Sequence, residues 1–343
     1  MTRRLPVYLL LDVSESMAGP PLRAVDEGVR LMLRALKKNP YALETLHMSV
    51  ITFAARAEVA LPLTELLSVV PPKLAVRPGT AMGAALTLCR ELISRDVKKS
   101  LPGDKGDYRP LVFILTDGAP TDDWRGPAAD LKRIVPRPGV IALGCGEDVE
   151  LETLSRIAET TVSLADVTPE GMEILFSWVS ASLAVSSQAA GAGECDGSPA
   201  VSLEKSPLRE GLTLVKFGEA PPRSSRPRLF LHRVCQRTGG LYVAVYRSVA
   251  GTGRYLASGT HPLPEDFLQD GAAPADPVDV SLLAGPETCP YCGNMGIFYC
   301  DECRTSYCFD VKDSSGTCYC RGCGKTYMLG DGNESFDVPG SSG

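Results

Sequence analysis

The sequence predicts an α/β protein with a doubly wound, mostly parallel sheet of the Rossmann-like kind. A small β-rich region and a zinc-ribbon-like cysteine domain are expected to follow. Three observations support this. Apolar runs alternate with helical patterns in the first half of the chain. A small, polar, glycine-rich stretch at residues 186–199 then ends the alternation. Eight of the 12 cysteines lie between Cys289 and Cys323, with repeated Cys-x-x-Cys spacing.

The first half of the chain supplies the elements of the sheet. Continuous apolar runs are typical of parallel strands covered on both faces. Strands are expected at residues 7–11, 47–53, 57–61, 111–115 and 140–143, the third being the antiparallel partner of the second after a tight turn. Apolar residues at helical spacing predict helices at residues 22–36, 82–97, 151–159 and 171–186. Such alternation predicts an open sheet with helices on both faces.

Composition changes divide the chain into five parts. We expect a first domain at residues 1–187 and a flexible linker at 188–200, which is rich in glycine and small polar residues. A β-rich segment is expected at 201–285, with short strands at residues 228–234, 241–247, 254–258 and 278–283. A cysteine-rich zinc-binding domain at 286–329 and a disordered Gly/Asp/Ser-rich tail at 330–343 complete the chain.

Composition and charge also limit the class of protein. Hydrophobic residues make up 44% and charged residues 22%, which is ordinary for a globular protein. The formal net charge of −6 argues against a dominant nucleic-acid-binding surface. The opening apolar run at residues 7–11 is broken by Asp12, which does not fit a signal peptide. No apolar segment approaches the roughly 20 residues that span a bilayer. We therefore expect a soluble, cytoplasmic protein.

Oxygen-bearing side chains follow two of the predicted buried strands. Asp12, Ser14 and Ser16 come directly after the first strand, and Asp117 follows the strand at residues 111–115. Ligands of open α/β sheets bind at the carboxyl ends of the strands, where the strand order reverses. Two carboxylates and two hydroxyls gathered there form an all-oxygen site of the kind that magnesium prefers.

These residues resemble the metal-ion-dependent adhesion site of the von Willebrand factor A family. The family motif is Asp-x-Ser-x-Ser, then a threonine, then an aspartate. Asp12, Ser14 and Ser16 match the first element, Thr80 in Gly-Thr-Ala-Met-Gly matches the second, and Asp117 matches the third. The resemblance implies a magnesium or manganese ion with one position open to a carboxylate of a partner protein. It also implies that the three hydroxyls bind directly and that the two aspartates act largely through water.

Each motif element also has an ordinary structural explanation. Asp and Ser after a strand commonly cap helices, and Thr80 could be a plain N-cap. Asp117-Gly118 is a common turn dipeptide. The joint occurrence of all three elements, in order and at strand ends or a helix start, favours the metal site. For Thr121, Asp122 and Asp123 we expect capping of the next helix, with a contact at the rim of the site as the alternative.

The cysteine-rich segment predicts two zinc ions, each held by four thiolates. Cys-x-x-Cys-Gly turns point two thiolates at one metal, and zinc takes four ligands tetrahedrally. Disulfides are disfavoured in the cytoplasm, and the spacing differs from the usual iron–sulfur patterns. The eight candidate ligands are Cys289, Cys292, Cys300, Cys303, Cys308, Cys318, Cys320 and Cys323.

Two pairings of these eight cysteines are open. In a zinc-ribbon pairing, Cys289/Cys292 join Cys320/Cys323, and the four cysteines between them hold the second zinc. In a sequential pairing, the first four cysteines hold one zinc and the last four hold the other. Cys89, Cys145, Cys195 and Cys235 are scattered and are not assigned to metal.

The combination of parts narrows the resemblance further. A von Willebrand A domain with Leu-Thr-Asp-Gly-Ala-Pro-Thr-Asp at residues 115–122, a β-rich segment and a C-terminal cysteine-rich domain resembles the TerY proteins of bacterial tellurium-resistance systems. The close spacing of Cys318 and Cys320 departs modestly from that pattern. The resemblance implies a non-enzymatic scaffold or adaptor in a stress response. Its implied partners are a serine/threonine protein kinase and a metal-dependent protein phosphatase.

Two other functions fit the sequence less well than a protein-interaction module. A metal-assisted hydrolase is disfavoured because the three histidines lie in no recognisable catalytic motif, and Cys89 lies among helical leucines as a packing residue. Nucleic-acid binding through the zinc domain is disfavoured because acidic residues there offset the basic ones.

Overall fold

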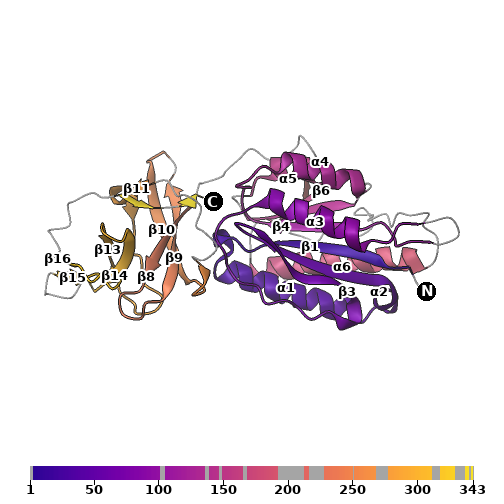
Figure 1. The fold of residues 1–343 in the computed structure, drawn as a ribbon, viewed down its shortest axis with the longest axis horizontal. Helices are drawn as coiled ribbons and strands as arrows, with labels where there is room; N and C mark the ends of the chain where they lie inside the picture. Colours follow the sequence, from indigo (N-terminus) through magenta and orange to yellow (C-terminus); the bar gives the residue numbers. More distant parts are fainter. Residues whose placement is uncertain are drawn as a thin grey trace. The chain divides into compact units, whose positions relative to one another are not determined.

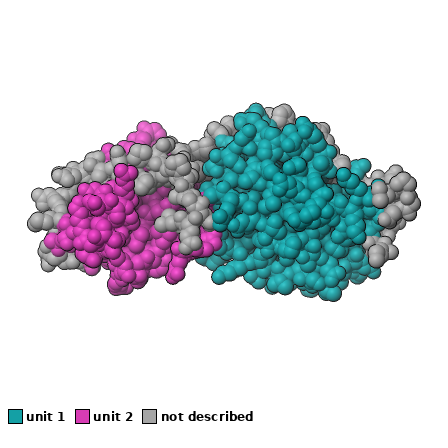
Figure 2. All heavy atoms as spheres, viewed as in Figure 1, with its two compact units in different colours: residues 1–75, 79–224 teal, residues 76–78, 225–343 magenta. Residues whose placement is uncertain are grey.

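The structure is a computed structural model. It describes residues 3–100, 105–135, 139–146, 149–164, 168–191, 212–215, 228–249, 251–267, 277–310, 317–328, 337–339 and 341–342. The chain divides into two compact units (Figure 2), the first with residues 1–75 and 79–224 and the second with residues 76–78 and 225–343. None of the helices in the described ranges combines the length and hydropathy needed to cross a bilayer.

The first unit is built on a seven-stranded sheet in the order β3-β2-β1-β4-β5-β6-β7. Its inner strands run parallel, and each edge strand pairs antiparallel with its neighbour. The strands are β1 (Leu5–Asp12), β2 (Leu46–Phe53), β3 (Ala57–Glu65), β4 (Leu111–Thr116), β5 (Val140–Cys145), β6 (Thr160–Leu164) and β7 (Leu212–Val215). The continuous apolar runs of β1, β4 and β5 are buried along their whole length, as expected of strands covered on both faces.

Helices cover both faces of this sheet (Figure 1). They are α1 (Pro20–Leu36), α2 (Pro40–Thr45), α3 (Met82–Asp96), α4 (Arg125–Ile134), α5 (Leu151–Ile157) and α6 (Pro169–Gly191), with short 3₁₀ turns η1 (Glu15–Met17) and η2 (Leu66–Ser68). On one face, α3, α4 and α5 share a core with the strands. On the other, α1 and α6 pack together so closely that a Cβ on Gly28 would lie 2.2 Å from the ring of Phe176. The predicted doubly wound, mostly parallel sheet is confirmed.

The second unit is built on strands paired mostly antiparallel. Its main sheet has the order β12-β10-β9-β8-β14-β13, and β18 also pairs with β8. Two further two-stranded sheets are β11 with β17 and β15 with β16. The strands are β8 (Arg228–Val234), β9 (Leu241–Val249), β10 (Arg254–Pro262), β11 (Pro277–Asp279), β12 (Leu283–Ala284), β13 (Gly296–Cys300), β14 (Thr305–Phe309), β15 (Thr317–Tyr319), β16 (Thr326–Met328), β17 (Asp337–Pro339) and β18 (Ser341–Ser342).

Several elements of the structure extend across the predicted domain boundaries. Helix α6 continues to Gly191, into the predicted linker, and residues 192–200 of that linker lie outside the described residues. Strand β7 lies in the predicted β-rich segment but pairs with β6 of the first sheet. The β-rich and cysteine-rich parts share one sheet, because β14 pairs with β8. In the predicted disordered tail, β17 and β18 pair with β11 and β8, and its other residues lie outside the description.

Candidate metal centres

Three strand ends lie side by side at one edge of the first sheet. Asp12, the last residue of β1, is in register with Phe53 at the end of β2. On the other side, Leu11 of β1 is in register with Leu115 of β4, so Thr116 and Asp117 follow at the same edge. Asp12 and Asp117 are both buried, at 0% and 1% exposure. Parallel pairing therefore brings together side chains that lie about a hundred residues apart in the sequence.

Hydrogen bonds join the residues of the first and third motif elements. The Ser16 hydroxyl donates to Asp117 Oδ1 at 2.5 Å, and its oxygen lies 2.9 Å from the hydroxyl oxygen of Ser14. The backbone amide of Ser14 donates to Asp12 Oδ1 at 2.9 Å. The Thr116 hydroxyl donates to the other Asp12 oxygen at 2.5 Å. The carboxylates and hydroxyls thus form one connected cluster.

Thr80 approaches the same cluster from the loop before α3. Gly79, with φ +79°, lies against the backbone of Ala55 just beyond β2, and Ala81 donates its amide to the Ala54 carbonyl. A Cβ placed on Gly118 would lie 3.9 Å from both Thr80 Oγ1 and Ser16 Oγ. Five side chains therefore gather at this edge, and we call them the oxygen site: Asp12, Ser14, Ser16, Thr80 and Asp117.

The electrostatics of the oxygen site favour a cation. Burial, together with the neighbouring charge of Asp117, raises the pKa of Asp12 to about 7, although hydrogen bonds from Ser14 and Thr116 act to lower it. Two buried carboxylates side by side are costly when both are ionised without a counter-charge. A hard divalent cation with oxygen ligands fits this donor set.

Comparison with known families assigns this part of the chain. The family model for the von Willebrand factor type A domain matches residues 7–168. Residues 7–168 form a von Willebrand factor A domain. The three predicted motif elements lie within this match, each at a strand end or just before a helix. The domain is a metal-dependent protein-interaction fold.

Solved structures show likeness to the von Willebrand A domain at low sequence identity. Proximal thread matrix protein 1 of the mussel byssus is 21% identical, with a TM-score of 0.40 over 53% of this chain and 48% of that one. A structure of the same protein with a zinc-occupied adhesion site is 19% identical, with a TM-score of 0.41 and the same coverage. A von Willebrand A protein from Catenulispora acidiphila is 17% identical, with a TM-score of 0.43 over 53% of this chain and 43% of that one. The chain spans about half the length of each. Among curated proteins, no match was found.

The capping predicted after the third motif element is partly wrong for this domain. Asp123 accepts a hydrogen bond from the Arg125 amide at 3.1 Å, at the start of α4, as expected. Asp122 instead caps the preceding helix α3, where its two oxygens accept from the amides of Gly83 and Ala84 at 2.8 and 2.9 Å. The sequence could not show this because the contact spans about 40 residues.

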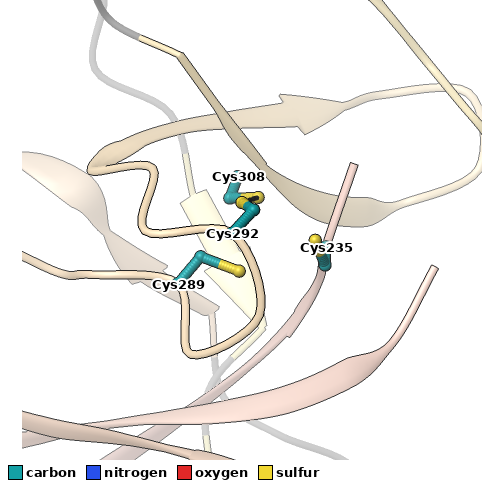
Figure 3. Close-up of side chains that lie close together, drawn as sticks. All are labelled: Cys235, Cys289, Cys292 and Cys308. Carbon is teal, nitrogen blue, oxygen red and sulfur yellow. Dashed lines mark hydrogen bonds between the residues drawn. The ribbon is translucent and has the colours of Figure 1, made fainter. Parts of the chain in front are cut away.

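In the second unit, eight of the nine described cysteines form two groups of four. Site A comprises Cys235, Cys289, Cys292 and Cys308, whose side chains gather from three separate segments (Figure 3). Site B comprises Cys300, Cys303, Cys320 and Cys323. Within each group all sulfur atoms lie within 4.8 Å of one another, and the sulfur atoms of Cys292 and Cys308, of Cys300 and Cys323, and of Cys303 and Cys320 are 3.5 Å apart. Four thiolates at about 2.3 Å from one zinc are spaced in this way, so either site could hold zinc.

The predicted ligand set and both predicted pairings differ from these two groups. Cys235 belongs to site A, and Cys318 belongs to neither group of the described residues. Cys318 is instead buried in an apolar cluster with Phe298 and Tyr307. The two groups interleave along the chain, because Cys300 and Cys303 lie at the turn of the β13–β14 hairpin while Cys308 lies further along β14, opposite Ile297. Neither the zinc-ribbon pairing nor the sequential pairing matches these two groups.

A turn motif that the sequence analysis missed identifies Cys235. In the turns that begin at Cys235, Cys289 and Cys320, the cysteine amide donates to the carbonyl five residues later, and the amide four residues later donates back. That fourth residue is a glycine with positive φ in each turn: Gly239, Gly293 and Gly324. These three turns share the pattern Cys-x-x-x-Gly, and Cys235 carries it without a second cysteine. In the first turn Thr238 stands where a second cysteine would be, and Cys308 supplies the fourth sulfur.

The surroundings of Cys235 favour its charged thiolate, whereas burial raises the pKa of Cys289 and Cys308 in the same site. Burial acts to raise the pKa of Cys235, but hydrogen bonds from Thr238 and from backbone amides lower it below its ordinary value. The amide of Thr238 lies 3.4 Å from the Cys235 sulfur, and the amide of Gln236 lies 3.4 Å from the Cys308 sulfur. Backbone amides aimed at sulfur are the usual outer shell of a thiolate metal site.

Proposed function

We propose that this chain is a protein-interaction scaffold, in which the von Willebrand A domain binds an acidic side chain of a partner protein through a divalent cation, magnesium or manganese. The observation that carries the proposal is the oxygen site, where the Ser16 hydroxyl bonds Asp117 and both carboxylates are buried. Ser14, Ser16 and Thr80 would hold the cation directly, and the two aspartates would act largely through water. With few charged ligands the cation keeps most of its charge, which favours a carboxylate from outside.

The partners are proposed from the TerY resemblance. It supports a serine/threonine kinase and a metal-dependent protein phosphatase, within a bacterial tellurite-resistance or stress response in the cytoplasm. In this proposal the second unit, with two zinc ions in sites A and B, is a further protein-binding module. Lys325 is paired with Asp301 at 3.4 Å and Glu302 at 3.6 Å, and Arg321 bonds the carbonyls of Gln236 and Arg237. These contacts occupy basic groups that a nucleic acid would need.

A non-enzymatic role agrees with the chemistry of the described side chains. Cys89, the cysteine on α3, is fully buried in the core, and burial raises the pKa of its thiol. A protonated, inaccessible thiol is a poor nucleophile. The von Willebrand A domain is also typical of interaction modules rather than catalysts.

The proposal is tested first by titration of the full chain with manganese. One ion should bind at the oxygen site, and Thr80→Ala should weaken its affinity by about tenfold or more. Thr64→Ala is the matched control, because Thr64 lies on β3 opposite Met48, away from the strand ends of the site. Equal manganese affinity in wild type and Thr80→Ala would show that the oxygen site is not the manganese site.

Partner capture is the second test. Immobilised full-length protein is incubated with an extract of the source organism, with and without magnesium, and retained proteins are identified by mass spectrometry. We expect a serine/threonine kinase or a metal-dependent phosphatase to be retained only with magnesium, by wild type and Thr64→Ala but not by Thr80→Ala. Recovery that ignores both magnesium and Thr80 would place recognition outside the oxygen site.

A further inference from the structure

The loop at residues 116–122, which begins at the last residue of β4, contacts Asp12, Ser16 and Thr80 of the oxygen site. At its start, Thr116 donates to the Asp12 carboxylate, and Asp117 accepts from the Ser16 hydroxyl. These two contacts reach β1 and η1. The end of the same loop reaches the start of α3, where Thr80 lies.

Thr121 forms hydrogen bonds with both the backbone amide and the backbone carbonyl of Thr80. The Thr80 amide donates to the Thr121 hydroxyl at 3.1 Å, and the Thr121 amide donates to the Thr80 carbonyl at 2.9 Å. With both backbone groups of Thr80 bonded to one neighbour, the position of its side chain is set by the loop at residues 116–122.

Asp122 holds the helix that follows Thr80. Its two oxygens accept from the amides of Gly83 and Ala84. Because both oxygens are bonded to α3, the Asp122 carboxylate is not part of the cation's ligand set. It also places a negative charge at the positive end of α3, which lies beside the site and would otherwise oppose a cation.

Gly83 allows α3 and the loop at residues 116–122 to approach each other this closely. A Cβ on Gly83 would lie 2.3 Å from the Asp123 carbonyl oxygen and 2.9 Å from Asp122 Oδ2. A side chain at position 83 would therefore push α3 and the loop at residues 116–122 apart. Gly126 is likewise the second residue of its helix, α4, but a Cβ there meets no atom within 4 Å.

We propose that Asp122, together with Thr121, is the positioning residue that keeps Thr80 on the cation of the oxygen site. This inference rests on the proposed metal binding. Asp122 acts through Thr80 and not on the cation directly. Outer-shell partners of this kind contribute about 10- to 100-fold to metal affinity.

A double-mutant cycle tests whether Asp122 acts through Thr80. Manganese affinity is measured by calorimetry for wild type, Thr80→Ala, Asp122→Ala and the double variant. We expect Asp122→Ala to lose about 10- to 100-fold in affinity, and to lose far less when Thr80 is already alanine. A residue that only caps α3 would lower the melting temperature and leave affinity unchanged. Unchanged affinity, or fully additive losses, would overturn the proposal.

Two glycine variants test the same proposal without changing a polar side chain. Gly83→Ala should weaken manganese binding by about tenfold or more, because it separates Asp122 from α3. Gly126→Ala should bind as wild type does. Equal affinity of the two variants would overturn the proposal, even if Asp122→Ala proved too unstable to purify. A wild type that binds no manganese would instead count against the proposed function.

Discussion

At the scale of single residues, the acidity of Asp12 sets the conditions under which the oxygen site can bind a cation. Burial and, to a lesser extent, the adjacent charge of Asp117 raise the pKa of this carboxyl to about 7. In an unfolded chain an aspartate ionises at about 3.9. The metal-free folded domain therefore holds a proton that the unfolded chain releases, and a cation must displace that proton.

We predict that metal affinity rises, and metal-free stability falls, as the pH increases through about 7. A raised folded-state pKa adds stability that is complete below the unfolded value and is lost as Asp12 ionises. Manganese titrations and thermal melts at about pH 5.5 to 8 measure both. Asp12→Asn should lose this component of the pH dependence of the metal-free melts. Affinity that stays constant between about pH 6 and 8 would contradict the role of Asp12.

The sequence predicted the residues that would gather in the oxygen site, but not what holds them. Asp12 and Asp117 follow the carboxyl ends of parallel strands, which meet at one edge of the sheet. Their proximity can therefore be predicted from the sequence pattern. The contact of Asp122 with Gly83 depends on how closely a loop and a helix approach, and periodicity carries no information about that distance.

At the scale of elements, the cysteine turns decide which sulfurs can share a metal. Counting Cys-x-x-Cys pairs assigned eight ligands within residues 289–323, which included Cys318 and left out Cys235. Cys318 lies on a strand, where its side chain alternates with the exposed Thr317 and Tyr319 and packs inward. Cys235 begins a turn with the same hydrogen bonds as the turns at Cys289 and Cys320. Backbone geometry, rather than local cysteine density, selects the ligands.

We predict that Cys235→Ser lowers the zinc content of the purified protein from about two ions to about one, because site A then lacks a thiolate. Cys318→Ala should keep about two, since neither site uses that sulfur. Elemental analysis with a protein assay measures both. The opposite result, with zinc lost in Cys318→Ala and kept in Cys235→Ser, would restore the ligand set expected from the sequence.

At the scale of the whole molecule, the sequence predicted one half of the fold better than the other. The parallel sheet of the von Willebrand A domain follows from apolar runs that each strand carries within itself. In the second unit, β14 joins β8 across about 70 residues, and Cys235 joins Cys308 in the same way. Because of these contacts, the expected β-rich segment and cysteine-rich domain form one unit. No local sequence pattern indicates such long-range contacts.

Cysteines of the two candidate zinc sites make up much of the buried core of the second unit. Two of its buried clusters are built largely from cysteines, with Cys235, Cys289 and Cys308 in one and Cys300 and Cys320 in another. Structural zinc contributes about 10–16 kcal/mol in small zinc domains, which is comparable to the whole stability of an ordinary domain, about 5–15 kcal/mol. The first unit has a large apolar core of its own.

We therefore predict that a strong zinc chelator unfolds the second unit and leaves the first folded. The sequence has two tryptophans, Trp124 and Trp178, and both are buried in the first unit, so their fluorescence reports on that unit alone. After chelation, tryptophan emission should stay unchanged, while limited proteolysis cuts within residues 225–343. Added magnesium should raise the melting temperature seen by tryptophan in wild type but not in Asp117→Ala. If chelation shifted tryptophan emission as well, the two units would share one folding transition, and zinc would support the von Willebrand A domain too.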